Sequence, residues 1–312
     1  MSTQTAFMRS LKEQEKWFVI VNPVANCGKG RSDAQPFLLE MQGSGAYKVT
    51  IRETTHPGHA TELARQAVAE HYTGVVAIGG DGTVSEVVNG LVGSKLPLII
   101  VPVGRGNDFV KSAVLVKKPH EVTDLILRGI DWPVDTIKID GVGHAINGIS
   151  IDDFATTVSQ QVGNGRLAYF GPALRNLSAY EDKLYQISFD DEPIIEDRFL
   201  VFVIMNGGIA GKGFKFTPGA KINDGILNAC LIKQVFGKLA RLKYLLAVQF
   251  GGIHTNLAAT EIRQINRATV TIPGASSIAL QIDGEHRQVS GDTISLSVEP
   301  ESLFLRSLPR QP

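Results

Sequence analysis

The stretch VVAIGGDGTVSEVVNG, residues 75–90, decides how the first half of the chain folds. Residues 75–78 form a short apolar run rich in Val and Ile, which is typical of a strand covered on both faces. Beyond the glycines, apolar side chains recur at helical spacing and form one stripe. The members of this stripe are Val84, Val87, Val88 and Leu91. The stretch therefore predicts a buried strand, a glycine-rich turn and an amphipathic helix.

The turn Gly79-Gly80-Asp81-Gly82-Thr83 is a candidate anion site. Its glycines allow positive φ and a close approach of the backbone to a ligand, and Thr83 is placed to cap the helix. Free N–H groups and the helix dipole at such a turn attract phosphate. Asp81 would repel a phosphate, so it predicts a mediating cation such as Mg²⁺, or a bound proton. A plain Asp-Gly turn is the alternative.

Two further loops follow apolar runs. Residues 18–22 lead into VNPVANCGKG (21–30), which matches neither the P-loop nor the dinucleotide fingerprint but offers the amides of Asn22 and Asn26. Residues 98–103 lead into VPVGRGNDFVK (101–111), where Asn107 and Asp108 suit helix capping, ligand contact or both. The loops that follow parallel strands emerge at one edge of a sheet, so we expect all three to meet there around one ligand.

The alternation of strands and helices predicts an α/β domain with a parallel sheet in the first half. After Val134 the apolar residues alternate with polar ones, which predicts antiparallel strands and a β-sandwich. The turns Asp140-Gly141 and Asp224-Gly225 lie between such runs, and one helix is predicted at 238–250.

Composition excludes several classes of protein. The 312 residues contain 31 Lys+Arg and 31 Asp+Glu, so the net charge is zero and a nucleic-acid partner is not expected. Cys27 and Cys230 are far apart, and the histidines lack zinc-ligand spacing, so no zinc site is predicted. The start of the chain is not a secretory signal, and no apolar run approaches the roughly 20 residues that span a bilayer. We expect a cytoplasmic protein that meets any lipid from the water side.

Two segments of the second half carry candidate chemistry. KINDGI, residues 221–226, is a turn, or a turn that also holds a cation through Asp224 and backbone carbonyls. QIDGE, residues 281–285, ends a strand with two acids. Glu285 would accept a hydroxyl proton if it faces the nucleotide site, and an ordinary hairpin with solvated acids is the alternative.

Five segments in this order resemble the diacylglycerol kinase catalytic-domain family, which includes bacterial lipid kinases and sphingosine kinases. They are NPVANCGKG (22–30), GGDGTVSEVVNG (79–90), NDF (107–109), PGAKINDGIL (218–227) and DGE (283–285). The resemblance implies a polar extension at 1–16, an α/β nucleotide-binding domain at 17–134 to which 302–312 return, and a β-sandwich substrate domain at 135–301. It also implies transfer of the γ-phosphoryl group of ATP to a lipid hydroxyl, with diacylglycerol as the leading acceptor.

The resemblance assigns roles to individual residues. It implies an ATP site formed by Asn22, Asn26, Thr54, Gly80, Asp81, Gly82, Thr83, Val84, Ser85, Glu86, Arg105, Asn107 and Asp108. Asp224 would bind a structural Mg²⁺ with the carbonyls of Lys221 and Ile226, and Asp135 would join Asp81 in a water network. Glu285 would be the catalytic base, with Asp81 as its rival.

Three departures from the family pattern bear on the site. Arg105 replaces a usual Thr and would either pair with phosphate or narrow the pocket. Asn26 stands where Gly is frequent. Residues 148–152 replace a more glycine-rich segment that is expected to face the lipid, so they bear on acceptor identity.

The expected partner is a membrane lipid with a free hydroxyl, met by peripheral contact, and edge strands are candidates for pairing in a homodimer. An NAD kinase-like enzyme and a non-catalytic nucleotide- or lipid-binding relic remain the alternatives.

Overall fold

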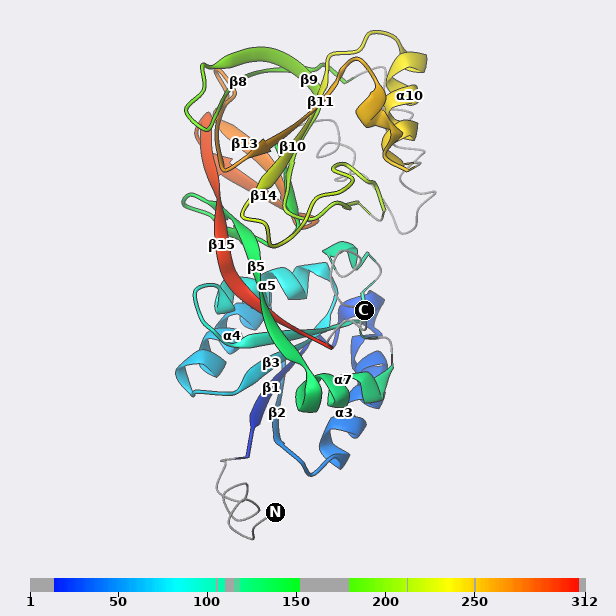
Figure 1. Cartoon of the computed structure of the whole chain (residues 1–312), viewed down its shortest axis with the longest axis vertical. Helices are drawn as coiled ribbons and strands as arrows, with labels where there is room; N and C mark the ends of the chain where they lie inside the picture. The colour runs from blue at the N-terminus through cyan, green and yellow to red at the C-terminus, as the bar shows by residue number, and fades with distance from the viewer. Residues whose placement is uncertain are drawn as a thin grey trace, which may run out of the picture.

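The structure is a computed structural model that describes residues 14–104, 106–109, 116, 118–151, 180–211, 213–249 and 251–308. It has two domains, with the N-terminal one below and the C-terminal one above in Figure 1. The N-terminal strands are β1 (Lys16–Val21), β2 (Lys48–Glu53), β3 (Gly74–Gly79) and β4 (Pro97–Pro102). The helices around them are α2 (Ala25–Gly28), α3 (Gly30–Gly43), α4 (His59–Ala69), α5 (Asp81–Leu91) and α7 (Pro119–Arg128).

The N-terminal sheet is parallel, in the order β2-β1-β3-β4. Alternate residues of its strands enter two different cores, as the two faces of a pleated strand require. One face packs against α4 and α5 through residues such as Val75 and Ala77. The other packs against α3 and α7 through residues such as Val76 and Ile78. The predicted strands at 18–22, 75–78 and 98–103 and the predicted α/β layering are confirmed.

Two long strands join the domains: β5 (Ile130–Ile139) and β15 (Thr293–Ser307) run antiparallel to each other (Figure 1). The far end of β15 pairs in parallel with β4 through Phe304 and Leu305, so the end of the described chain extends the N-terminal sheet. The expected boundary between residues 134 and 135 falls inside β5, and the two sheets are continuous through this strand pair.

The C-terminal domain is antiparallel and almost entirely β. Its further elements are β6 (Gly143–Ala145), β7 (Gly148–Ile151), β8 (Lys183–Phe189), β9 (Ile195–Met205), β10 (Leu227–Lys233), α10 (Lys238–Gln249), η1 (Ile253–Asn256), β11 (Thr260–Ile265), β12 (Arg267–Thr271), β13 (Ser277–Ile282) and β14 (Glu285–Ser290). The inward side chains form one core that contains Tyr185, Phe199 and Phe202. The predicted helix at 238–250 is confirmed as α10, and the two predicted Asp-Gly turns carry left-handed glycines at Gly141 and Gly225.

The strand β7 is buried along its whole length between β9 and β13. Residues 148–151, which were expected to face the lipid, therefore lie in the interior of the sandwich, and residue 152 is outside the described residues. None of the described helices is long and apolar enough to cross a membrane.

Candidate functional site

The glycine-rich turn lies where β3 ends and α5 begins, and its glycines are required by close packing. Gly80 is the N-cap of α5 and has an extended backbone with φ −98° and ψ −172°, so the predicted positive φ is wrong there. A Cβ added to Gly79 would lie 2.4 Å from Oγ1 of Thr83, and one added to Gly104 would lie 2.4 Å from Cα of Gly80. The loops after β3 and β4 thus touch through their backbones.

Thr83 does not cap α5, contrary to the prediction. It lies within the helix, where its Oγ1 accepts a 2.9 Å hydrogen bond from Nδ2 of Asn22. Oδ1 of the same Asn22 accepts the backbone N–H of Val24 at 3.1 Å. Asn22 therefore ties the loop after β1 to the first turn of α5 and leaves the helix N-terminus open.

The first loop owes its shape to two left-handed residues. Asn26 has φ +50° and Cys27 has φ +57°, a region that Asn tolerates better than most residues and that Gly enters freely. This geometry is compatible with the Asn found at position 26. Nδ2 of Asn26 donates to Asp33 at 2.8 Å, which fixes the loop to α3.

The Asp81 carboxylate closes the third loop. Its two oxygens accept the backbone N–H groups of Asn107 at 2.7 Å and Asp108 at 2.8 Å. Nδ2 of Asn107 bonds the carbonyl of Gly104 at 2.8 Å, and Asn107 is left-handed with φ +49°. Burial raises the pKa of Asp81 to about 6, and the nearby charge of Asp108 adds to this effect, while the two N–H bonds oppose it. Asp81 is therefore placed to position the third loop. The predicted contact Arg105 is outside the described residues.

Glu86 holds the N-terminus of the neighbouring helix. Its carboxylate accepts the N–H groups of Gly58 at 2.8 Å and Ala60 at 3.1 Å at the start of α4. Two of the four orphan donors of that helix end are satisfied in this way. Thr54 follows β2 at the same edge of the sheet, where its N–H bonds the carbonyl of Val21 at 2.9 Å.

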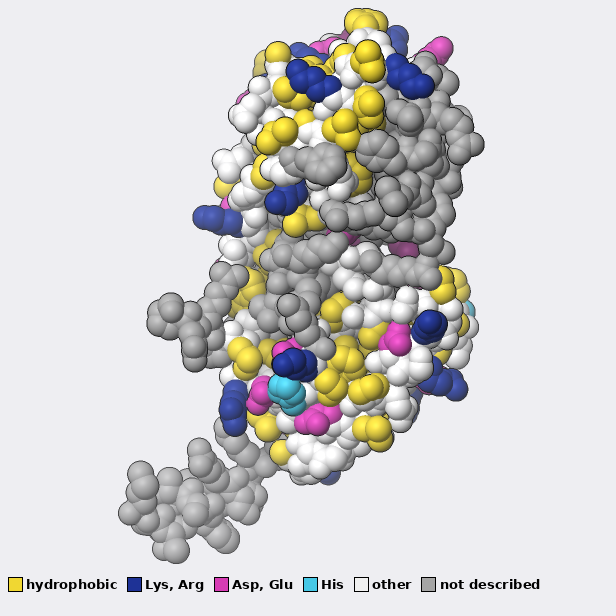
Figure 2. All heavy atoms as spheres, turned by 90° about the vertical axis from the view of Figure 1, so that its right-hand side faces the viewer, with side chains coloured by type: hydrophobic (Ala, Val, Ile, Leu, Met, Phe, Trp, Pro, Cys, Tyr) yellow, Lys and Arg dark blue, Asp and Glu magenta, His cyan; other side chains and the backbone are white. Residues whose placement is uncertain are grey.

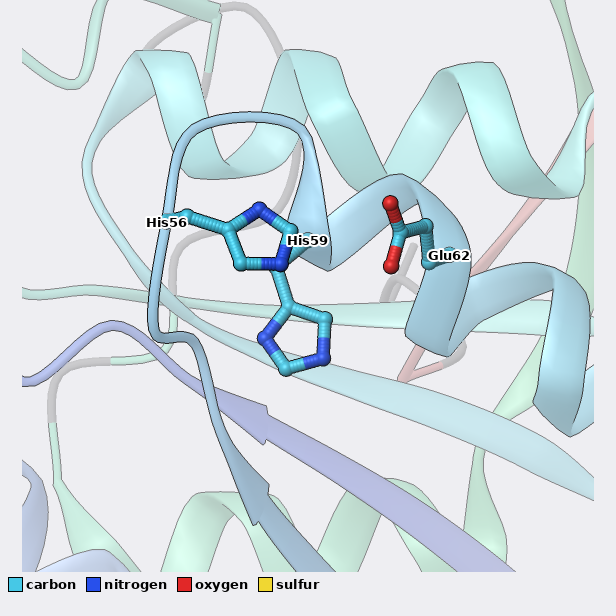
Figure 3. A group of neighbouring side chains, drawn as sticks. All are labelled: His56, His59 and Glu62. Atoms are coloured by element: carbon cyan, nitrogen blue, oxygen red, sulfur yellow. The ribbon is translucent and has the colours of Figure 1, made fainter.

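Three polar side chains gather at the start of α4, as Figure 3 shows: His56, His59 and Glu62. The two imidazoles stack with centroids 4.7 Å apart and planes 18° apart. Nδ1 of His59 accepts the N–H of Thr55 at 3.1 Å, so the lone pair of this nitrogen is already used within the 55–59 turn. His56 lines the interdomain cleft described below, whereas His59 and Glu62 are not part of its lining. Sequence spacing did not indicate this cluster.

A cleft of about 820 Å³ opens between the two domains and connects these loops. Most of the predicted nucleotide contacts line it, namely Asn22, Asn26, Thr54, Gly80, Gly82, Thr83, Ser85 and Glu86. Asp81, Asn107 and Asp108 lie behind this surface, and the Val84 side chain is buried in the hydrophobic core between the sheet and the helices.

Glu285 reaches the same cleft from the other domain. It begins β14, is exposed and lines the cleft opposite the first turn of α5. A Cβ added to Gly82 would lie 2.5 Å from its Oε1. The missing side chain at Gly82 thus makes room for a carboxylate directly at the helix N-terminus.

Asp283, two residues earlier, locks the turn that carries Glu285. Its carboxylate accepts the N–H groups of Ile146 and Asn147 at 2.9 Å and of Gly148 at 3.1 Å. Burial raises the pKa of Asp283, and these three N–H bonds work against that rise. The turn is therefore fixed to β7, and Glu285 is held in place over α5.

The predicted cation segment lies outside the lining of this cleft. Asp224 is exposed, and its Oδ1 accepts the N–H of Ile226 at 3.2 Å, as in an Asx-type turn. Asp135 is buried and accepts the N–H groups of Gly225 at 2.7 Å and Glu301 at 2.9 Å. Asp135 thus anchors the 221–226 turn to the β5–β15 pair through these backbone N–H groups, and its water network with Asp81 stays a prediction.

Several site residues were not found by sequence reasoning. Asn89 crosses the domain boundary: its Oδ1 accepts the N–H of His144 and its Nδ2 donates to the His144 carbonyl, both at 2.8 Å. Arg65 and Arg287 bring positive charge to the lining of the cleft from α4 and β14. Asn89 lies in α5 and Arg65 in α4, so their helical spacing from the loops that begin these helices is a usable signal. Arg287 reaches the cleft only through strand pairing.

Comparison with known proteins agrees with this architecture. The diacylglycerol kinase catalytic domain matches residues 16–139, and the YegS C-terminal NAD kinase beta sandwich-like domain matches residues 141–306. The chain is 25% identical over 276 residues to a protein of Bacillus subtilis (strain 168) named "Diacylglycerol kinase", covering 86% of this chain and 89% of that one.

A second relative, from Xanthomonas euvesicatoria pv. vesicatoria (strain 85-10), is named "Probable lipid kinase YegS-like" and is 29% identical over 286 residues, with the same coverage of 86% and 89%. Among solved structures, that of a diacylglycerol kinase from Bacillus anthracis str. Sterne shares the fold, with a TM-score of 0.71 at 22% identity over 94% of this chain and 97% of that one. The predicted fold and the resemblance are confirmed, and the chain belongs to the diacylglycerol kinase and YegS-like lipid kinase family.

Proposed function

We propose that this protein is an ATP-dependent lipid kinase that transfers the γ-phosphoryl group to a lipid hydroxyl, with diacylglycerol as the acceptor. The single observation that carries the proposal is the placement of Glu285. A carboxylate from the sandwich faces the open N-terminus of α5 across an interdomain cleft. A phosphate at the helix end and a hydroxyl beside the carboxylate would lie next to each other.

The N-terminal side of the cleft suits a triphosphate. The N–H groups at the start of α5 favour an anion, and the N-cap residue Gly80 has no side chain to occupy them. Arg65 and Arg287 add positive charge from two sides. Asn22, Asn26 and Thr54 line the same wall and would contact the rest of the nucleotide.

The chemistry proposed for Glu285 is general base catalysis. Glu285 takes the proton of the lipid hydroxyl as the alcohol oxygen bonds to the γ-phosphorus. The bond from that phosphorus to the β,γ-bridging oxygen breaks, and ADP leaves with the electron pair. Such transfers depend mainly on positioning and charge neutralisation. Asp81 acts here as a positioning residue, because both of its oxygens are occupied by backbone N–H groups.

The donors near the turn 221–226 fit a hard cation, because an exposed carboxylate and backbone carbonyls are the ligands that Mg²⁺ accepts together with water. Asp224, with the carbonyls of Lys221 and Ile226, would hold a structural Mg²⁺. Mg²⁺ bound with the nucleotide would supply charge neutralisation to the phosphates. Asp135 supports the turn through the N–H of Gly225.

The test is transfer of label from γ-labelled ATP to a panel of acceptors, read by product chromatography. The panel contains diacylglycerol, phosphatidylglycerol, ceramide, a sphingoid base and NAD. We expect label in the diacylglycerol product. Label in NAD with none in any lipid would contradict the proposal and favour the NAD kinase-like alternative. The absence of label from every product would favour the non-catalytic one. Cytoplasmic location and a homodimer stay predictions.

A further inference from the structure

Two large apolar side chains are exposed around the start of α10, three positions apart in the sequence. Phe236 is 78% exposed and Leu239 is 82% exposed, the highest values for large hydrophobic residues in the described part of the chain. Single exposed apolar residues are common on protein surfaces, but here the two highest exposures fall within four residues of each other. We call residues 236–239 the α10 tip.

The sequence around the α10 tip is rich in basic residues. The segment 225–260 contains four basic residues and no acidic one, in a chain whose net charge is zero. Two of the four are neutralised by partners from other segments, Lys233 by Asp197 at 2.9 Å and Arg241 by Asp182 at 2.7 Å. Lys238 and Lys243 are exposed and pair with no acid within the residues that the structure covers. The tip is therefore both apolar and cationic.

Side chains of α10 bond the α10 tip to the rest of the domain. The Arg241 guanidinium is buried and donates to the carbonyls of Val235 at 2.8 Å and Tyr180 at 2.6 Å, in addition to the carboxylate of Asp182. Tyr244, on the buried face of α10, packs in a hydrophobic core, and its hydroxyl accepts the N–H of Ala259 at 3.0 Å. One face of α10 is thus fixed to the sandwich, which keeps Phe236 and Leu239 pointed away from it.

The side of the molecule that carries α10 suits an extended surface such as a bilayer. α10 lies on the right-hand side of Figure 1. Figure 2 looks onto that side and shows hydrophobic side chains mixed with Lys and Arg at the upper end of the molecule. An apolar tip with basic side chains beside it matches the interface of a bilayer, where apolar groups enter the acyl boundary and cations meet anionic headgroups.

We infer that the α10 tip docks this protein on an anionic lipid bilayer, with Phe236 and Leu239 inserted and Lys238 and Lys243 on the headgroups. The inference rests on the proposed function, since docking on a bilayer brings a lipid kinase to the membrane that holds its acceptor. The charge pattern selects the partner: a protein groove would satisfy the apolar pair, but the exposed lysines beside it, Lys238 and Lys243, complement an anionic surface.

The test is co-sedimentation of the full chain, without ATP, with vesicles of phosphatidylcholine and with vesicles that also contain phosphatidylserine. We expect binding that requires phosphatidylserine and weakens with salt. The double variant Phe236→Ser/Leu239→Ser should lower the partition coefficient at least about tenfold, because both inserted side chains are lost. Lys238→Gln/Lys243→Gln should remove most of the dependence on phosphatidylserine.

The matched control is Ile194→Ser, which alters another side chain that is 68% exposed, in the turn between β8 and β9. It should bind vesicles like the parent. Equal binding by the Phe236→Ser/Leu239→Ser variant, or no binding by the parent, would overturn the inference. Loss of a dimer in that variant, with no vesicle binding by the parent, would assign the tip to a second copy of the chain and also overturn it.

A soluble short-chain diacylglycerol separates the two proposals. Turnover of this acceptor does not need docking, so the Phe236→Ser/Leu239→Ser variant should phosphorylate it as fast as the parent. If the parent does not phosphorylate it, the proposed function fails whatever the vesicles show. If both proteins phosphorylate it and both bind vesicles equally, the docking inference alone fails.

Discussion

The two Asp-Gly turns of the cleft, one from each domain, look alike and do different work. Asp81-Gly82 opens α5, and Asp283-Gly284 lies between β13 and β14. Each Asp carboxylate accepts backbone N–H groups from a neighbouring loop, two in the first case and three in the second. The second turn continues into Glu285, an exposed carboxylate at the cleft. The comparison teaches that an acid in a family motif serves position when its oxygens are already bonded and serves chemistry when they are free.

The largest expected effect comes from Glu285→Gln. Loss of a general base lowers the rate of transfer by roughly 10²- to 10⁴-fold. Because Glu285 is exposed, the melting temperature should stay close to that of the parent. The measurement is kcat with diacylglycerol, together with a thermal melt.

The control for Glu285→Gln is Glu196→Gln, which changes a β9 carboxylate that bonds Gln186 and is not in the lining of the cleft. It should keep the parent's kcat. Full activity in Glu285→Gln would place the base elsewhere, with Asp81 as the first candidate.

Asp81→Asn should act on stability first. In the variant the side-chain oxygen still accepts one of the two backbone N–H groups of Asn107 and Asp108, but the amide NH₂ cannot accept the other. That N–H loses its partner, so the free energy of unfolding should fall by about 1–3 kcal/mol. Turnover should fall as well, because the third loop loses its anchor. Chemical denaturation of both proteins measures the difference.

The same variant has a signature in pH. Burial raises the pKa of Asp81 from 3.8 to about 6. Between these two pH values the folded protein keeps the Asp81 proton and the unfolded chain has lost it, so protonation of Asp81 stabilises the folded state. This stabilisation is complete below about pH 4 and is lost as the pH rises through 6. With about 1.4 kcal/mol per pKa unit, the parent should lose about 3 kcal/mol more than Asp81→Asn between pH 4 and 7. If the free energy of unfolding changed with pH in the same way for both proteins, Asp81 would not be the group with the raised pKa.

Gly82→Ala tests the position of Glu285 from the α5 side of the cleft. Its Cβ would meet Oε1 of Glu285 at 2.5 Å, and the flexible carboxylate must turn away from the helix end. We expect kcat to fall about tenfold, a cost of about 1.4 kcal/mol in transition-state energy, with little change in stability. The matched control is Gly43→Ala at the end of α3, where an added Cβ meets no atom within 4 Å. Equal kcat values for these two variants would mean that Glu285 does not act from its place over α5.

The smallest effect should come from Asp224→Ala. If Asp224 holds a structural Mg²⁺, the ion stabilises the folded parent in proportion to its occupancy. The parent's melting temperature should then rise with added Mg²⁺ more than that of the variant, by a few degrees at saturation. The same rise in both proteins would remove Asp224 from the proposed site.

Much of the fold could be predicted because the spacing of apolar residues along the sequence indicates its strands and helices. The apolar strands and the stripe of Val84, Val87, Val88 and Leu91 need only neighbouring residues to show their pattern. The convergence of three loops at one sheet edge follows from parallel topology. Four residues that the sequence assigned to the first loop and glycine-rich turn, Asn22, Asn26, Gly82 and Thr83, do line the cleft.

The rest depends on contacts that sequence order does not reveal. The bond from Asn22 to Thr83 spans 61 positions, and the Asp283 carboxylate meets backbone groups 135 to 137 positions away. The glycines of the turn suggested positive φ, but Gly79 and Gly104 are needed because another group lies where a Cβ would be. Arg287 enters the cleft through the pairing of β14 with β13, which no local pattern predicts.

The central claim is that Glu285 takes the proton while the loops behind it only hold the nucleotide in place. The most direct measurement is ATP binding by calorimetry combined with single-turnover label transfer to diacylglycerol, on the parent and on Glu285→Gln. The account predicts an unchanged ATP affinity for the variant and a transfer rate lower by at least about 10²-fold. Transfer at the parent's rate with ATP bound, or loss of ATP binding itself, would contradict it.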